Sequence, residues 1–149
     1  MPDEYKKILI MEAGGIGDMI MSTPALKAIR RKFSNSEITL LTVPRSAQAL
    51  NNKRYTNKIL YFKQESFSKG PSRSTYNQVF SNLRLLWSLR KERFDTMIDL
   101  EAIETWKSSL LRYIFYTCVG AENKVGRDSD GKGFFLDVKV HDDILEQSM

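Results

Sequence analysis

The chain has 149 residues, and its 42% hydrophobic and 28% charged composition is ordinary for a soluble globular protein. This length allows one domain with a hydrophobic core. The single cysteine, Cys118, excludes a disulfide framework and, because it lies in an apolar run, is expected to be buried. The first residues lack the features of a signal peptide, and the longest apolar run is too short to span a bilayer. We therefore expect a cytoplasmic protein, with peripheral contact at the inner membrane face left open.

The formal net charge of +5 is spread unevenly along the chain. Nine lysines and arginines lie between Arg45 and Arg93, where only Glu65 and Glu92 oppose them. Such a stretch can attract nucleic acid, a phosphorylated lipid or an anionic membrane surface. The alternative, with equal weight, is an ordinary solvated face.

Short runs of branched apolar residues alternate with amphipathic stretches, which predicts strands alternating with helices. Strands are expected over 6–12, 37–43, 57–63, 95–101, 123–127 and 134–140. Helices are expected over 45–52, 78–94 and 105–120. A further helix, the first long one, ends at 35–36. It begins either near Asp18, with a bend at Pro24, or after Ser22 as its cap. The polar residues over 64–77 predict a loop, and those over 128–133 a turn. This alternation predicts an α/β fold, a Rossmann-like parallel sheet with helices on both faces.

Apolar spacing also predicts which helical side chains reach the core. In the first long helix these are Met21, Ala25, Ile29 and Phe33. In the helix over 78–94 they are Val79, Leu83, Leu86 and either Leu89 or Arg90. The aromatic residues Trp87, Trp106, Phe115 and Tyr116 also stand at spacings that suit core packing. Gly120 is expected to end the helix over 105–120.

A glycine-rich loop, formed by Gly14, Gly15 and Gly17, separates the first strand from the first helix. In such a fold this loop lies at the carboxyl edge of the sheet, where ligands bind. The dinucleotide fingerprint G-x-G-x-x-G is incomplete, because Ile20 occupies the third glycine position and no acid follows the second strand. The Walker pattern is absent as well. The sequence therefore disfavours a nicotinamide or P-loop site.

Asp18 follows Gly17 directly, and a carboxylate at the mouth of a phosphate cradle would repel its ligand. One interpretation is that Asp18 only caps the helix. The other is that it projects into a cleft and accepts a proton from a substrate hydroxyl. The helix N-terminus would keep it ionised and weakly basic, which suits a reaction in which the proton leaves late.

The stretch KILIMEAGGIGDMIMSTPALKAIRRKF, followed by ITLLTV, resembles the N-terminal signature of glycosyltransferase family nine, the ADP-heptose:lipopolysaccharide heptosyltransferase family. The stretches RFDTMIDLE and NKVGR resemble two later landmarks of the same half. The resemblance implies that residues 1–149 form the N-terminal, acceptor-side domain of a two-Rossmann (GT-B) glycosyltransferase. It also implies that the C-terminal nucleotide-sugar domain is absent from this chain, so that the chain alone should not catalyse transfer.

The same resemblance implies an inverting transfer of heptose or a related sugar, without a metal or cofactor. The acceptor it implies is a lipopolysaccharide core or another saccharide, free or lipid-linked. Asp18 matches the proposed general base, and the glycines would let the substrates approach the backbone closely. Thr23 belongs to the same motif and is assigned to its loop and helix geometry. The substrate-binding residues expected are Gly14, Gly15, Gly17, Thr23, Lys63, Lys69, Arg73 and Glu101.

Several of these assignments compete with plainer ones. Glu101, with Asp99, ends a strand at the same sheet edge as Asp18 and either lines the cleft or caps the next helix. Arg127 follows a strand and can face the cleft, whereas His141 has no ligand partners nearby and predicts no metal site.

The basic residues Lys63, Lys69 and Arg73 either meet an anionic acceptor or are solvated. Two departures from the family pattern, Glu12 at an often basic position and glycines at 14 and 15 where serines are common, argue against the usual phosphorylated lipid acceptor.

Two other classes of function stay open. One is a non-catalytic Rossmann-like module that binds an anion or a nucleotide through the glycine loop. The other is a basic nucleic-acid-binding domain, but the chain lacks a recognisable reading motif, so no nucleic acid is expected as a partner.

Overall fold

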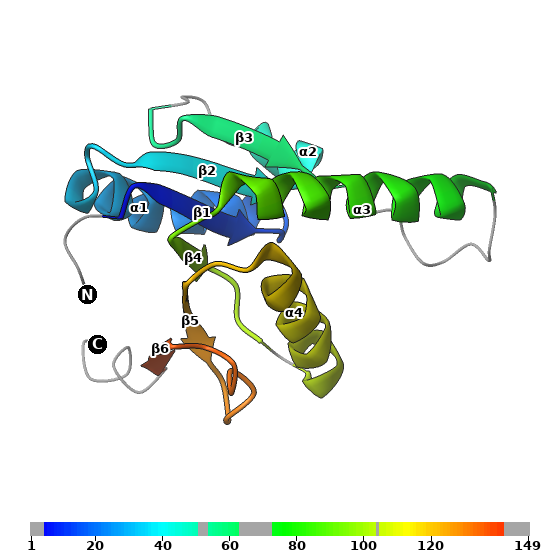
Figure 1. Ribbon diagram of the computed structural model, residues 1–149. Helices are drawn as coiled ribbons and strands as arrows, with labels where there is room; N and C mark the ends of the chain where they lie inside the picture. The colour runs from blue at the N-terminus through cyan, green and yellow to red at the C-terminus, as the bar shows by residue number, and fades with distance from the viewer. Residues whose placement is uncertain (1–4, 51–53, 63–72, 104, 142–149) are drawn as a thin grey trace.

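Six parallel strands form one sheet in the computed structural model, which describes all residues except 1–4, 51–53, 63–72, 104 and 142–149. The order of the strands is β3-β2-β1-β4-β5-β6 (Figure 1). The elements are β1 (Lys7–Glu12), α1 (Ile16–Lys32), β2 (Glu37–Thr42), α2 (Pro44–Ala47), β3 (Lys58–Tyr61), α3 (Arg73–Glu92), β4 (Thr96–Asp99), α4 (Trp106–Val119), β5 (Asn123–Asp128) and β6 (Val138–His141). The predicted Rossmann-like parallel sheet is thereby confirmed.

The central strand β1 shows how the sheet divides the core into two layers. Its Ile8 and Ile10 belong to an apolar cluster with Met19 and Leu26 of α1, on one face of the sheet. The alternate residues Leu9 and Met11 belong to a second cluster, built with the buried residues Leu89, Tyr116 and Val119 of α3 and α4. Figure 1 agrees, because α1 lies behind the sheet and α3 crosses in front of it.

The strand order reverses between β1 and β4, which are hydrogen-bonded neighbours with Ile10 opposite Ile98. The chain leaves β1 toward β2 on one side and leaves β4 toward β5 on the other. The two connections therefore diverge at the carboxyl edge, and ligands bind in such folds at that switch point.

The first helix begins at Ile16, with Gly15 as the residue before it, and not at Ser22. It continues through Pro24, near which the Thr23 hydroxyl donates to the Met19 carbonyl at 3.1 Å. The buried side of this helix carries Met19 and Leu26, seven residues apart.

The prediction that Met21 reaches the core is wrong, because this side chain is 81% exposed. The buried residue near this end of α1 is Met19, two residues earlier. Toward the other end the prediction is confirmed, because Phe33 is 4% exposed and Ile29 packs against the same apolar cluster.

Other predicted core residues of the helices are also exposed. Leu83, Trp87 and Trp106 are all more than half exposed, and Cys118 is exposed rather than buried. Helix packing buries only one side of α3 and α4, and these four residues lie on the other side. Tyr116 is fully buried as expected, and α4 ends at Gly120, which has the left-handed φ of 71° that favours glycine.

Two predicted boundaries also differ. Helix α3 begins at Arg73, so residues 73–77 are helical and not part of a loop, while 63–72 lie outside the described residues. The last described strand is limited to Val138–His141. Phe135 and Leu136, expected to be in this strand, instead turn into the core from the segment before it.

Candidate active site

A cleft of about 510 Å³ opens at the switch point, between the segment that follows β1 and the segment that follows β4. The end of β1 and the segment after it contribute Glu12, Gly14, Asp18, Met21 and Ser22. The segment after β4 contributes Leu100, Glu101, Ala102, Thr105, Ser108 and Arg112, and Arg127 comes from β5. The N-terminal ends of α1 and α4 therefore converge on one hollow.

Glu12, the last residue of β1, ties the glycine loop to the first helix. Its side chain is 1% exposed. One carboxylate oxygen accepts from the Gly14 N–H at 3.0 Å, and the other accepts from the Ser22 hydroxyl at 2.6 Å. A basic side chain at this position could accept neither bond, so Glu12 defines the shape of the loop in this chain.

Asp18 bonds to the start of α1 and also lines the cleft, so both of the placements that the sequence left as alternatives are present. Its role as a proton acceptor stays a prediction. The Asp18 Oδ2 accepts from the Gly15 N–H at 2.7 Å, which satisfies one of the unpaired donors at the start of α1. At the same time its side chain is exposed and lines the cleft. The capping bond fixes the direction of the carboxylate, because a side chain held at one oxygen loses most of its rotational freedom.

The three glycines of the loop are under different constraints. A Cβ on Gly14 would lie 2.6 Å from Asp18 Oδ2 and 2.7 Å from Asp18 Cβ, so no side chain fits there. A Cβ on Gly15 would make only an ordinary contact, and one on Gly17 would meet nothing within 4 Å. Close packing therefore requires a glycine at position 14 alone, and the backbone at Gly17 is open.

Behind the cleft, a buried ionic network joins β4 to α4. Arg112 donates through its two terminal nitrogens to Asp99 and Glu101, and the Tyr116 hydroxyl donates to the same Asp99 oxygen. The other Asp99 oxygen accepts from the Glu101 N–H at 3.0 Å. This network holds Glu101 at the wall of the cleft, as one of the two sequence interpretations expects.

Asp99 and Glu101 do not cap α4, because the Thr105 hydroxyl accepts the Ser108 N–H at 3.2 Å. The Thr105 and Ser108 hydroxyls are themselves part of the cleft wall.

Burial dominates the electrostatics of the network. It raises the pKa of the Asp99 carboxyl, against the opposing effect of the Arg112 guanidinium. It also raises the pKa of Glu101, again opposed by Arg112. Burial would lower the pKa of Arg112, but the charges of Asp99, Tyr116 and Glu101 outweigh it and the pKa is raised. Arg112 therefore stays cationic between two carboxylates whose ionised forms are costly to bury.

The remaining predicted site residues fall into three groups. Arg127 lines the cleft. Thr23 is bonded to its own helix and is not among the residues that line the cleft. Arg73 is the first residue of α3, and Lys63 and Lys69 lie outside the described residues. The substrate-binding roles of these residues stay predictions.

Sequence reasoning missed Ser22, Thr105, Ser108 and Arg112 as parts of the cleft wall. For Arg112 a signal was present, because one cation inside an apolar helical run must find a carboxylate partner when its helix is buried. The hydroxyl residues gave no such signal, since serine and threonine are common at any helix start.

The cleft wall combines hydrogen-bond acceptors with donors. Asp18 and Glu101 contribute carboxylates, Arg112 and Arg127 contribute N–H donors, and three hydroxyls can do either, while the buried Glu12 carboxylate is occupied by Gly14 and Ser22. Such a mixture suits a ligand that carries many hydroxyl groups. In the part of the chain that the structure describes, no cluster of three or more histidine, cysteine or acidic side chains is arranged to hold a metal ion.

Comparison with known proteins relates this fold to glycosyltransferases. No protein-family model and no curated protein matches the chain. A glycosyl transferase of family 9 from Veillonella parvula DSM 2008 matches with a TM-score of 0.68 and 17% identity, over 94% of this chain and 36% of that one. The E. coli heptosyltransferase WaaC, solved with ADP-2-deoxy-2-fluoro heptose, matches with a TM-score of 0.64 and 17% identity, over 91% of this chain and 42% of that one.

These similarities confirm, at the level of the fold, the resemblance that the sequence motifs indicate. The chain has the α/β fold found in these GT-B glycosyltransferases and spans less than half the length of either protein.

Among the described residues, no helix has both the length and the apolar character needed to cross a bilayer.

Proposed function

We propose that this chain is the acceptor-binding domain of an inverting glycosyltransferase, in which Asp18 is the general base. One observation carries the proposal: an exposed carboxylate, held at one oxygen by the Gly15 N–H, lies at the wall of a polar cleft at the switch point of the sheet. A general base needs this combination of fixed direction and access.

In the proposed reaction, Asp18 takes the proton of an acceptor hydroxyl as that oxygen bonds to the anomeric carbon of the donor sugar. The bond from the anomeric carbon to the nucleotide diphosphate breaks, and its electron pair leaves with the diphosphate. Attack opposite the leaving group inverts the anomeric centre.

The acceptor in this proposal is a saccharide, free or lipid-linked, bound by the donors and acceptors of the cleft wall. Asp18 and Glu101 place carboxylates on that wall, which favours hydroxyl groups over phosphates near Asp18. For an anionic part of the acceptor, the proposed contacts are Lys63, Lys69 and Arg73. The nucleotide-sugar donor would be held mainly by a second domain outside the 149 residues.

The test is the variant Asp18→Asn in the polypeptide that joins this domain to its donor-binding domain. The amide oxygen can still accept from the Gly15 N–H, so folding should be preserved, whereas proton acceptance is lost. We expect transfer to fall by about 10²–10⁴-fold at an unchanged melting temperature. The matched control is Asp130→Asn, the same chemical change at an exposed carboxylate outside the cleft wall. Full turnover by Asp18→Asn would remove Asp18 from the mechanism.

Ligand titration of the 149-residue chain separates this proposal from an anion- or nucleotide-binding module. Amide chemical shifts of Gly14, Gly17 and Ser108 should move on addition of hexoses or heptoses. Phosphate and ADP should move them little, because carboxylates line the cleft. Tight ADP binding at the glycine loop would favour the alternative class.

A further inference from the structure

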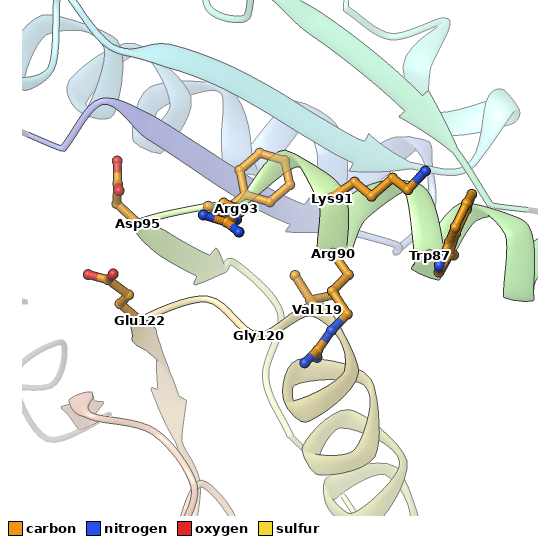
Figure 2. A pocket seen from close by; sticks show the side chains of 9 residues that line it. Trp87, Arg90, Lys91, Arg93, Asp95, Val119, Gly120 and Glu122 are labelled. Carbon is orange, nitrogen blue, oxygen red and sulfur yellow. The ribbon is translucent and has the colours of Figure 1, made fainter.

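The outer sides of α3 and α4 expose large apolar side chains. Six of them are between 51% and 64% exposed: Leu83, Trp87, Trp106, Leu110, Leu111 and Ile114. We call these six residues, together with the exposed cations Arg84, Arg90, Lys91 and Lys107, the outer α3–α4 face. Both helices lie on one face of the sheet, and they contact each other. The Arg90 guanidinium of α3 donates to the Cys118 carbonyl of α4 at 3.1 Å. Figure 2 shows this side chain pointing toward the end of α4.

The charges on this face are all of one sign. Its exposed cations are Arg84, Arg90, Lys91 and Lys107. Helix α4 contains no acidic residue, and α3 contains one, Glu92. That carboxylate accepts from Lys7 at 3.1 Å and from Lys58 at 3.2 Å, at the amino edge of the sheet. The only acid of the two helices is thus directed away from the face and neutralised.

Cations and apolar groups are interleaved on the face and not separated into a core and a rim. The Lys91 ammonium lies 3.4 Å from the centre of the Trp87 ring, and Lys107 follows Trp106 directly. Cores of protein–protein interfaces are depleted in lysine. At a lipid bilayer the mixture is favourable, because indole rings and aliphatic side chains enter the interfacial layer while lysine and arginine reach the phosphates.

We propose that the outer α3–α4 face docks onto a membrane surface that contains anionic lipids. The exposed leucines and tryptophans would enter the headgroup region, and the four cations would pair with lipid phosphates. The contact would be peripheral, made by the outer sides of folded helices.

The docked orientation would place the cleft close to the lipid headgroups. Trp106 and Lys107 begin α4, and their neighbours Thr105 and Ser108 line the cleft wall. A saccharide carried on a membrane lipid would therefore reach the cleft without leaving the surface. This consequence rests on the proposed function, but the docking itself does not require any catalytic residue.

Vesicle binding by the 149-residue chain tests the inference directly. The chain contains two tryptophans, Trp87 and Trp106, and both belong to the face. Mixed phosphatidylcholine and phosphatidylglycerol vesicles should therefore shift the tryptophan emission to the blue and carry the chain with them in sedimentation. Phosphatidylcholine vesicles should bind it far more weakly, and salt should weaken the binding to the mixed vesicles.

Two pairs of variants locate the contact. Leu110→Glu should weaken partitioning roughly tenfold or more, whereas Ile20→Glu, at a 58% exposed position of α1 on the opposite face, should leave it unchanged. Lys107→Gln should weaken it about fivefold, whereas Lys27→Gln, an exposed lysine of α1, should have little effect. Circular dichroism checks that each variant is folded.

Three results would overturn the inference: no binding to the mixed vesicles, equal losses from the α1 and α4 variants, or self-association without lipid that buries the tryptophans. The last would show that a second copy covers the face. Asp18→Asn should bind vesicles as the unchanged chain does. Loss of transfer with retained vesicle binding, or the reverse, therefore shows which of the two proposals has failed.

Discussion

Two hollows at opposite edges of the sheet differ in what their charged groups do. The cleft at the carboxyl edge measures about 510 Å³, and a groove at the amino edge measures about 780 Å³. The groove lies where α3 and α4 end and β4 and β5 begin, and Figure 2 shows its lining. Size alone would favour the groove as the ligand site.

The bonds of the lining residues favour the cleft. In the groove, Asp95 accepts two backbone N–H groups, of Lys6 and Lys7, at 2.8 Å each, and Arg90 donates to the last carbonyls of α4. These charged groups thus satisfy backbone groups at the start of β1 and at the end of α4. In the cleft, the network behind the wall positions Glu101, and the capping bond positions Asp18, and both residues line the hollow. Polar groups that are held in place and line a hollow therefore identify a candidate site better than volume does.

The two regions should differ most in how much the free energy of unfolding falls when one arginine is removed from each. Arg112→Met leaves the Asp99 carboxylate, whose side chain is 2% exposed, without its cation, and should lower the free energy of unfolding by about 3–5 kcal/mol. Arg90→Met removes hydrogen bonds to carbonyls at an exposed helix end and should cost about 1 kcal/mol. Urea denaturation measures both. Equal costs would contradict the contrast between a buried network and an exposed cap.

A smaller effect is expected within the cleft itself, from two glycines of its loop. In Gly14→Ala the new methyl group meets Asp18, whose Cβ cannot move without moving α1, so stability should fall by about 1–3 kcal/mol. Gly17→Ala meets nothing within 4 Å and places alanine inside a helix, which should stabilise by up to about 1 kcal/mol. Melting temperatures that move the same way in both variants would show that the packing of Gly14 against Asp18 is not tight.

The smallest expected effect is on the pH dependence of stability, which should differ between the amino edge and the carboxyl edge of the sheet. At the amino edge, hydrogen bonds from Lys7 and Lys58 hold the pKa of Glu92 below its usual 4.5. Its contribution to stability is therefore present above pH 4.5 and lost as the pH falls through the lowered value. At the cleft, burial holds the pKa of Glu101 above 4.5, so its contribution is present below pH 4.5 and lost as the pH rises through the raised value.

Two glutamine variants separate these contributions. Glu92→Gln should flatten the loss of stability on acidification, and Glu101→Gln should flatten the loss on raising the pH, each by less than about 1 kcal/mol. Denaturation curves at a series of pH values check both. A Glu101→Gln variant that is less stable only at low pH would contradict the direction of the Glu101 pKa.

Local sequence features were enough to predict the architecture and the edge of the sheet at which the cleft lies. Apolar runs, helical periodicity and the glycines after the first strand are local features, and each follows from backbone geometry that a few neighbouring residues set. They predict the alternation of strands and helices, the parallel sheet and the position of Asp18 at its carboxyl edge. The family resemblance rests mainly on residues 7–33, which contain these glycines and Asp18, and on three later stretches, ITLLTV, RFDTMIDLE and NKVGR.

Long-range packing sets which side chains meet across the sheet and which side of each helix is covered, and the sequence pattern does not show it. Asp99, Glu101 and Arg112 come together because β4 lies beside β1 and α4 packs back on the sheet, an arrangement that spacing along the chain does not encode. Trp87, Trp106 and Leu83 have helical spacings compatible with a core, yet one sheet face covers only one side of each helix. Burial depends on these partners, and partners are chosen by the whole fold.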